Sequence, residues 1–569
     1  MSAAANGRAA AALVAGLVDA GLRHVVLSPG SRNTPLTLAF AERDDLQVTS
    51  ILDERAAGFF ALGVARSSGC PVALCCTSGS AATHYLPALV EADASRVPLV
   101  VLTADRPDEL QHCGAPQTMD QRQLFGTFVR WNADLPAPSP EVRPDHLVAV
   151  AAQAVQHALT LPQGPVHLNC AFRKPLWAPE APQNEPPRPA PRWIRGTSML
   201  DGASVDGLVE SLTTAQRGVI VCGPHSADSD AFAAHVRVLA ARLQWPLVVE
   251  AGSGARFGSD TPQIVSTHDV FLRGPVGEEL AADCILRFGQ WVTSGPLSRW
   301  LHDQPRTLLV SADGARHDPA QGAALWIDAP PTRLVEALCE RLPAAQEDGG
   351  WCARWRAIEH TTRTVIEQHG RHLDWEGAVA RAVICAVPDG AAIHLANSMP
   401  IREVNALCPP DGRQLTAYVS RGVNGIDGTL ATTAGEAVGS GRPVTALVGD
   451  LAFLHDLGGL LMAADQPVTF VVVDNGGGGI FGFLPIAQND RHFESLFRTP
   501  QTANLEQLCA GAGVRYTAVD TAHELPPAVR AEHERPGAGV IHIKVDPSVN
   551  HARHEALWEG VASALEGRS

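Results

Sequence analysis

At 569 residues, with 45% hydrophobic and 18% charged side chains, the chain is too long for a single hydrophobic core and too apolar for wholesale disorder. Its formal charge of −16 would repel a phosphate backbone and no block of lysine and arginine offsets that repulsion, which argues against a nucleic acid partner. The twelve cysteines form no CxxC pair and many lie in apolar runs, which predicts buried, reduced thiols and a cytoplasmic protein.

The first predicted element is a helix in the alanine-rich segment Ala9–Val18. One arginine precedes this segment, no clear cleavage site follows it, and Asp19 interrupts the apolar run. These features favour an amphipathic helix over a signal peptide. No apolar run approaches the roughly 18 residues needed to cross a bilayer, so we expect no membrane span.

Short apolar segments then alternate with longer helical patterns, which is typical of βαβ units and parallel sheets. The strands predicted in the first block are His24–Ser28, Thr49–Leu52, Pro71–Thr77, Val97–Ala104 and Pro165–Cys170. Each ends near a glycine, serine, aspartate or arginine, and we expect these ends to form one rim of a sheet. The proline-rich stretch Pro179–Pro191 then predicts a linker.

Two further blocks repeat this pattern on either side of a polar passage at Ala344–Gly350. The strands predicted in the second block are Gly218–Gly223, Trp245–Ala251, Cys284–Gly289 and Thr307–Ala312. Those predicted in the third block are Ala391–Ala396, Val444–Gly449, Val468–Val473 and Val540–Val545. The predicted fold class is therefore α/β, with three doubly wound, mainly parallel-sheet domains at 1–180, 193–345 and 351–569.

Candidate metal ligands follow two successive strands of the third block. One strand ends at Asp450, and the next ends at Asn475 and four glycines. Because the carboxyl ends of parallel strands share one rim, neighbouring strands about 5 Å apart would let both side chains reach one ion. Mg²⁺ prefers such oxygen ligands, and a backbone carbonyl such as that of Gly477 would add a third. Each feature alone is equally typical of a helix cap or a flexible loop.

A carboxylate pair, Asp53 and Glu54, lies where a predicted strand of the first block meets a helix. The helix macrodipole favours acidic residues at such a position without any catalysis. Spacing alone therefore assigns Glu54 no function.

The motifs that follow strand ends resemble, in order and residue type, those of thiamine-diphosphate-dependent enzymes. The resemblance is strongest to the branch of 2-succinyl-5-enolpyruvyl-6-hydroxy-3-cyclohexene-1-carboxylate synthases, in which a leucine at the position of Leu451 is normal. It covers the first and third blocks, whereas the second matches only in place and general pattern. The motifs are Ser28–Asn33, Asp53–Arg55, Leu102–Pro107, Gly425–Gly428 and Gly449–Asp456.

This resemblance implies that the first domain binds the pyrimidine of thiamine diphosphate and the third binds its diphosphate. Glu54 would activate the aminopyrimidine ring, and Mg²⁺, or Mn²⁺ as the alternative ion, would be held by Asp450, Asn475 and the Gly477 carbonyl. Further implied cofactor contacts are Ile426, Leu451, Ile480, Phe481 and Leu484. The implied catalytic contacts are Ser31, Arg32 and Gln117, and the implied substrate contacts are Arg106, Ser398, Arg402 and Arg421.

The implied reaction decarboxylates 2-oxoglutarate and adds the resulting succinyl carbanion to isochorismate in a 1,4 sense, in menaquinone biosynthesis. Both substrates are dicarboxylates, which suits the paired hydrogen bonds of guanidinium groups. The resemblance also implies a homodimer or a dimer of dimers. The alternatives are another thiamine-diphosphate carboligase or 2-oxo-acid decarboxylase, and a catalytically inactive regulatory homologue.

Four arginines of the second block have no place in this scheme: Arg256, Arg273, Arg287 and Arg299. They are predicted to be surface charges, with a regulator pocket as the alternative.

Overall fold

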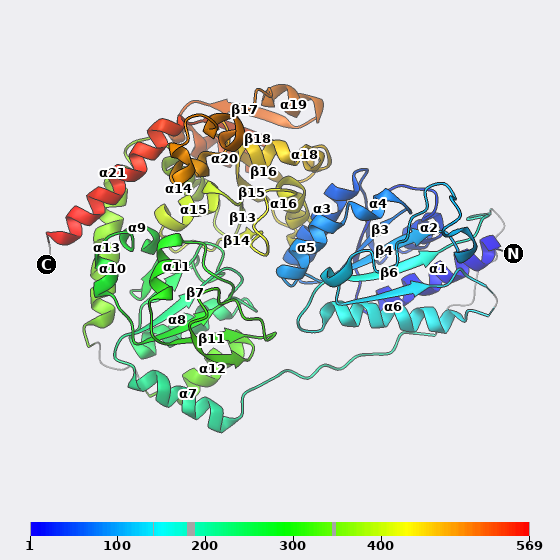
Figure 1. Cartoon of the computed structure of the whole chain (residues 1–569), viewed down its shortest axis with the longest axis horizontal. Helices are drawn as coiled ribbons and strands as arrows, with labels where there is room; N and C mark the ends of the chain where they lie inside the picture. The colour runs from blue at the N-terminus through cyan, green and yellow to red at the C-terminus, as the bar shows by residue number, and fades with distance from the viewer. Residues whose placement is uncertain (1, 140, 179–187, 344–348, 568–569) are drawn as a thin grey trace.

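The computed structural model describes residues 2–139, 141–178, 188–343 and 349–567 (Figure 1). It contains three six-stranded sheets in which every strand pair is parallel, which confirms the predicted α/β class with three parallel-sheet domains. The predicted domain ends at 180 and 345 lie outside the described residues. So do most of the predicted linker Pro179–Pro191 and most of the polar passage Ala344–Gly350.

The first sheet has the strand order β2-β1-β3-β4-β6-β5. Its strands are β1 His24–Leu27, β2 Gln47–Ser50, β3 Val72–Cys76, β4 Leu99–Asp105, β5 Trp131–Leu135 and β6 Val166–Ala171. The helices around it are α1 Ser2–Asp19, α2 Thr34–Ala41, α3 Glu54–Ser68, α4 Ser80–Thr83, α5 Leu86–Ala94 and α6 Pro144–Leu159. Helix α1 confirms the helix predicted around Ala9–Val18 and packs beside α6 (Figure 1).

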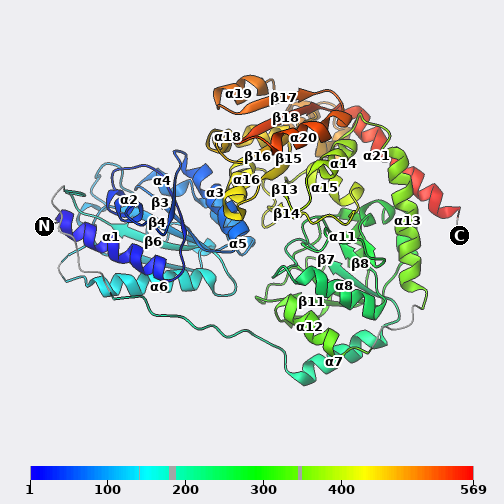
Figure 2. The same ribbon diagram turned by 180° about the vertical axis from the view of Figure 1, so that it is seen from behind.

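After β6, the described residues 188–201 form no helix or strand and lead to α7 in the central domain (Figure 2). The central sheet has the order β12-β11-β10-β7-β8-β9. Its strands are β7 Gly218–Cys222, β8 Leu247–Val249, β9 Ile264–Val265, β10 Cys284–Phe288, β11 Thr307–Ser311 and β12 Ala323–Asp328. Its helices are α7 Gly202–Thr214, α8 Phe232–Leu243, α9 His268–Phe271, α10 Val276–Glu279, α11 Gly295–His302 and α12 Pro331–Arg341.

The third sheet, β14-β13-β15-β16-β18-β17, repeats the strand order of the first. Its strands are β13 Ala392–Leu395, β14 Thr416–Val419, β15 Val444–Gly449, β16 Val468–Asp474, β17 Arg515–Val519 and β18 Gly539–Lys544. Its helices are α13 Trp351–His369, α14 Glu376–Ala386, α15 Met399–Leu407, α16 Thr429–Ser440, α17 Asp450–His455, α18 Leu457–Ala463, α19 Leu505–Gly511, α20 Leu525–His533 and α21 Pro547–Glu566.

Helices α3 and α16 join the first and third domains by packing backbone against backbone. A Cβ added at Gly63 of α3 would lie 2.1 Å from the carbonyl oxygen of Thr432, and one at Gly435 of α16 would lie 2.0 Å from that of Phe60. Glycine at both positions therefore lets the two helices approach closely. Since α3 begins at Glu54, this packing also fixes the position of that acid.

We expect Gly435→Ala to lower the free energy of unfolding by about 1–3 kcal/mol, because the added methyl group must force the helices apart. Gly207 is the matched control, since it also lies in a helix but a Cβ there would meet nothing within 4 Å. Urea unfolding of both variants measures the difference. Equal stability of Gly435→Ala and Gly207→Ala would contradict the close packing.

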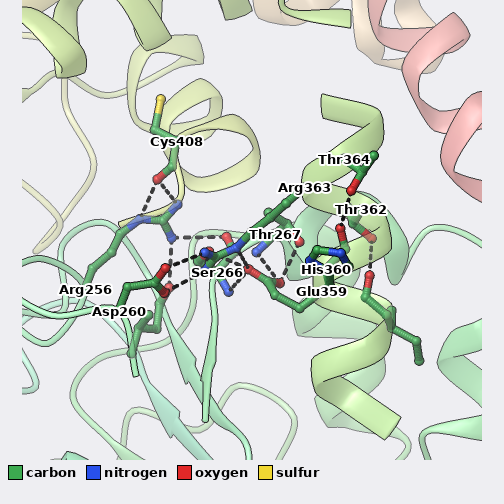
Figure 3. A network of polar contacts seen from close by, with 12 residues as sticks. Arg256, Asp260, Ser266, Thr267, Glu359, His360, Thr362, Arg363, Thr364 and Cys408 are labelled. Carbon is green, nitrogen blue, oxygen red and sulfur yellow. Dashed lines mark hydrogen bonds and ion pairs between the residues drawn. The ribbon is translucent and has the colours of Figure 1, made fainter. Parts of the chain in front are cut away.

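Arg256 ties the central domain to α15 of the third domain. Its fully buried guanidinium group donates to the carbonyl oxygens of Val249 and Val404, each at 2.9 Å. It also donates to that of Cys408 at 2.7 Å (Figure 3). Two of these carbonyls belong to the C-terminal end of α15, where a cation also complements the helix dipole. The central domain thus supports the helix that carries Arg402.

Two predictions about side-chain exposure are corrected. Arg256 and Arg287 are completely buried, so they are not surface charges; their hydrogen bonds to carbonyl oxygens compensate for lost hydration. All twelve cysteines are free thiols, as predicted, but Cys113 and Cys385 are exposed.

Within the described ranges, no helix combines the length and hydropathy that a bilayer span requires.

Candidate functional site

A cavity of about 350 Å³ lies at the carboxyl edge of the third sheet. Its walls come from the segments that follow four strands: 397–402 after β13, 421–426 after β14, 449–452 after β15 and 475–484 after β16. The cavity lies at the point where the strand order reverses, between β13 and β15. Open α/β sheets bind ligands at such switch points.

The candidate metal ligands Asp450 and Asn475 lie in the wall of this cavity and are both buried. Their strands β15 and β16 are direct neighbours, as a shared ion requires. Burial, together with the nearby carboxylate of Asp474, raises the pKa of Asp450 to about 7. The Oδ1 atom of Asn475 is buried and has no hydrogen-bond partner among the described residues. A carboxylate with a second carboxylate nearby, together with an amide oxygen that lacks a hydrogen-bond partner, is suited to binding a hard divalent cation.

No group of three His, Cys, Asp or Glu side chains suited to a metal ion occurs within the described part of the chain. A cation at Asp450 would therefore use amide and carbonyl oxygens, together with oxygens of its ligand. Mg²⁺ typically binds in this way, through one or two carboxylates and substrate phosphates.

The glycines after Asn475 let the backbone come close to its neighbours. Gly477 has a φ of +122°, and a Cβ there would lie 2.1 Å from the carbonyl oxygen of Arg498. The carbonyl oxygen of Gly477 accepts from the N–H of Gly479 at 2.9 Å, which leaves its second lone pair for another partner. A side chain at position 477 would disrupt this loop.

Apolar side chains form the rest of the cavity wall. The five predicted cofactor contacts of this kind all line it: Ile426, Leu451, Ile480, Phe481 and Leu484. Leu484 is 47% exposed, which is high for a leucine and leaves one side of the cavity uncovered in the single chain.

Three predicted polar substrate contacts, Ser398, Arg402 and Arg421, also line this cavity. Arg402 donates to the carbonyl oxygen of Ser398 at 2.5 Å, and Arg421 donates to Oδ1 of Asn397 at 3.0 Å. Burial lowers the pKa of Arg402, whereas burial and the neighbouring Arg402 lower the pKa of Arg421 to about 10. Ser398 has a φ of +74°, a strained value that is often found at ligand sites.

The predicted residues of the first domain gather at a different place, the carboxyl edge of the first sheet. Arg32 and Ser31 follow β1, and the main-chain N–H of Arg32 donates to the hydroxyl of Thr77 beyond β3. Arg106 follows β4, and it adds to the effect of burial in lowering the pKa of Arg32. Gln117 donates to the carbonyl oxygen of Ser78 at 2.9 Å.

Arg32, Arg106, Arg402 and Arg421 share one property. Among the described residues, no carboxylate lies within 4.0 Å of their guanidinium nitrogens, although the main-chain N–H of Arg106 donates to Oδ1 of Asp105. Arg32 is buried, and both Nη1 of Arg106 and Nε of Arg421 are buried without a hydrogen-bond partner. Because an unpaired buried charge is costly, these groups are suited to an anionic ligand.

Glu54 does not line the cavity of the third domain. It opens α3, where Asp53 caps the helix by accepting from the N–H of Arg55 at 2.9 Å. Arg55 contacts His455 at the end of α17, whereas Asp450 opens that helix. Leu52, two residues before Glu54, is 82% exposed, so the surface near Glu54 is uncovered in one chain.

A second cavity of about 700 Å³ adjoins the first, since both are lined by Met399, Arg402, Ile480 and Leu484. Arg273 and Arg299 of the central domain also line it. Both arginines are exposed, as predicted for surface charges, and they lie in the wall of a cavity beside the candidate site.

Sequence reasoning missed Glu376, a buried carboxylate in the cavity wall that accepts from Nδ2 of Asn475 at 2.8 Å. Burial and the nearby Glu403 raise the pKa of Glu376 to about 7. Its only local feature is its position at the start of a helix, which many solvated acids share. No signal in the sequence separates it from those.

Family models match three segments of the chain. Residues 7–124 match the thiamine pyrophosphate enzyme, N-terminal TPP binding domain, and residues 410–543 match the corresponding C-terminal TPP binding domain. Residues 193–395 match the middle domain of thiamine pyrophosphate enzymes. Thiamine pyrophosphate is another name for thiamine diphosphate.

Solved structures share the fold. A benzoylformate decarboxylase from Polynucleobacter necessarius has a TM-score of 0.75 at 17% identity, over 95% of this chain and 98% of that one. A thiamine diphosphate-dependent 4-hydroxybenzoylformate decarboxylase from Rhodococcus jostii has a TM-score of 0.72 at 20% identity, over 95% and 99%. At these sequence identities, the comparison shows a shared fold and nothing about activity.

Proteins with higher sequence identity to this chain are also known. The chain is 39% identical to a 2-succinyl-5-enolpyruvyl-6-hydroxy-3-cyclohexene-1-carboxylate synthase of Geobacillus thermodenitrificans, over 98% of this chain and 96% of the relative. It is 40% identical to that of Geobacillus kaustophilus, over 98% of both, and 38% identical to that of Myxococcus xanthus, over 98% and 97%. The chain therefore belongs to the 2-succinyl-5-enolpyruvyl-6-hydroxy-3-cyclohexene-1-carboxylate synthase family of thiamine pyrophosphate enzymes.

Proposed function

We propose that this protein decarboxylates 2-oxoglutarate and adds the remaining succinyl unit to isochorismate in a 1,4 sense, as a step of menaquinone biosynthesis. The relatives' name describes the product: its succinyl group corresponds to 2-oxoglutarate without one carboxylate, and its ring to isochorismate. The observation that carries the proposal is the set of arginines without carboxylate partners at the two sheet edges. Two dicarboxylate substrates would supply those partners.

Bound thiamine diphosphate would supply an electron sink for decarboxylation and for carbon–carbon bond formation. Mg²⁺, or Mn²⁺ in its place, would be held by Asp450, Asn475 and the Gly477 carbonyl. Ile426, Leu451, Ile480, Phe481 and Leu484 would surround the cofactor with apolar side chains and keep water from the reacting carbon.

The residues of the first domain would complete the site. The carboxylate of Glu54 would hold a proton on the aminopyrimidine ring through a hydrogen bond, with Ser31, Arg32 and Gln117 nearby. Because Glu54 does not line the cavity of its own chain, we propose that it serves the cavity of a second copy. The exposed Leu52 and Leu484 support a homodimer, or a dimer of dimers, that covers them.

The proposed domain boundaries are 1–180 for the pyrimidine-binding domain, 193–345 for the central domain and 351–569 for the diphosphate-binding domain. The matched segments 7–124 and 193–395 support the first division, between 180 and 193. The second segment extends beyond 351, but its last strand, β13, pairs with β15 of the third sheet, which supports the earlier boundary.

Purified protein supplied with 2-oxoglutarate, isochorismate, thiamine diphosphate and Mg²⁺ should form the product named above, detected by its mass. Turnover of pyruvate in place of 2-oxoglutarate would favour a different carboligase or decarboxylase. A lack of CO₂ release from every 2-oxo acid would favour an inactive homologue.

We expect Arg402→Met and Arg421→Met each to weaken the apparent affinity for the dicarboxylate substrates by about 10- to 100-fold, because a charged hydrogen bond contributes about 1.5–3 kcal/mol. The substrate whose KM rises shows which one each arginine binds. Arg43→Met is the control, since Arg43 already pairs with Asp45 at 2.6 Å on the surface. Unchanged KM values for both substrates would contradict the role of either arginine.

A further inference from the structure

The side-chain amide of Asn475 is held in one orientation. Its Nδ2 donates to Oε1 of Glu376 at 2.8 Å, and its Oδ1 is buried without a partner among the described residues. An asparagine amide offers two donors on nitrogen and acceptor lone pairs on oxygen, so the partner decides which atom points where. Rotating this amide by half a turn would set its oxygen against the oxygen of Glu376.

Glu376 is itself held in place by Asn550. Nδ2 of Asn550 donates to the same Oε1 of Glu376 at 3.1 Å, and the main-chain N–H of Glu376 donates to Oδ1 of Asn550 at 3.0 Å. All three side chains are buried. The reciprocal pair joins the first turn of α14 to the first turn of α21, and both meet the end of β16 at Asn475.

The loop leaves no room on the nitrogen side of the amide. A Cβ at Gly479 would lie 2.3 Å from Nδ2 of Asn475. The main-chain carbonyl of Asn475 is also fixed, because it accepts from Nη2 of Arg498 at 3.1 Å. The main-chain carbonyl and the side chain of Asn475 are thus both constrained, and Oδ1 is the one side-chain polar atom without a hydrogen-bond partner among the described residues.

We propose that Glu376 is a positioning residue which, together with Asn550, turns Oδ1 of Asn475 toward the cation that anchors the diphosphate. This inference rests on the proposed function for the cation itself. Glu376 does not need to touch the ion, since two amide groups already occupy its Oε1. Groups that orient metal ligands in this way typically change metal affinity by about 10- to 100-fold when removed.

The test measures Mn²⁺ binding by the full-length protein with thiamine diphosphate, from the electron paramagnetic resonance signal of free Mn²⁺. Glu376→Met removes the acceptor, and Asn550→Leu removes its support. Both should weaken Mn²⁺ binding by about 10- to 100-fold. Glu376→Gln keeps an oxygen that accepts from both amides, so its affinity should stay within about threefold of the unmodified chain.

Glu532→Met is the matched control for the loss of a buried carboxylate. Glu532 is buried in the same domain but pairs with Arg515 and Arg535, away from the cavity. Its replacement should lower the melting temperature without changing Mn²⁺ affinity. The melting temperatures of all variants are measured without metal, so that unfolding and loss of binding are separated.

Normal Mn²⁺ affinity in Glu376→Met or in Asn550→Leu would overturn the proposal. If Glu376→Gln binds Mn²⁺ as weakly as Glu376→Met does, the negative charge of Glu376 is what matters and Glu376 is itself a metal ligand. That result would also overturn the proposal. If either Glu376→Met or Asn550→Leu fails to fold, the other variant and Glu376→Gln decide. Failure of the unmodified protein to bind Mn²⁺ with thiamine diphosphate would instead overturn the proposed cation site.

Discussion

Replacing Glu54 with glutamine should lower product formation by about 10²- to 10⁴-fold, the usual contribution of a positioned acid or base. Glutamine preserves the shape of the side chain but cannot carry the negative charge that would hold a proton on the aminopyrimidine. Binding of thiamine diphosphate with Mg²⁺ should persist, because Asp450 and Asn475 lie in the other domain. Product mass and cofactor-dependent fluorescence quenching measure the two effects separately.

Asp53→Asn is the control for this experiment. Asp53 is the adjacent carboxylate, but its Oδ1 caps α3, a role that asparagine performs equally well. Its activity should remain close to that of the unmodified chain. Full activity in Glu54→Gln, or equal losses in both variants, would remove Glu54 from the proposed chemistry.

Mixing two inactive variants should restore activity if the site is built from two copies of the chain. Glu54→Gln damages the first-domain half of a site, and Asp450→Ala damages the third-domain half. In a mixed dimer, one site carries both lesions and the other carries none. Random exchange of subunits should therefore restore up to about a quarter of full activity, since half of the dimers are mixed and one of their two sites is intact.

The control pair for this experiment is Asp450→Ala with Asn475→Leu, whose lesions lie in the same half, so no intact site can form. Native mass spectrometry verifies that subunits have exchanged. Mixed dimers of Glu54→Gln and Asp450→Ala that stay inactive would show that the two halves do not meet across subunits.

The inner strands of all three sheets were predictable, whereas most edge strands were not. The residues of β3, β4 and β7 are buried throughout, because parallel sheets are covered on both faces and their inner strands are continuous apolar runs. The strands absent from the prediction are β5, β9, β12, β14 and β17, and each lies at a sheet edge. Four of them are partly exposed, and β9 has only two residues, so they lack that apolar signal.

One edge strand was predicted but displaced. The expected strand Thr49–Leu52 is β2 at Gln47–Ser50, and Leu52 is 82% exposed beyond its end. In the sequence, an exposed apolar residue after a strand cannot be distinguished from an apolar residue inside the strand. Periodicity therefore places such a boundary only to within a few residues.

The sequence by itself determined the three parallel sheets and the residues at their carboxyl edges, since both follow from local apolar runs and from the residues next to them. Tertiary structure alone decided that Glu376 accepts a hydrogen bond from Asn475, 99 residues away, and another from Asn550, 174 residues away. It also decided that Glu54 does not line the cavity that contains Asp450 of the same chain. Such contacts depend on how helices and sheets pack, and no local period of the chain encodes that arrangement.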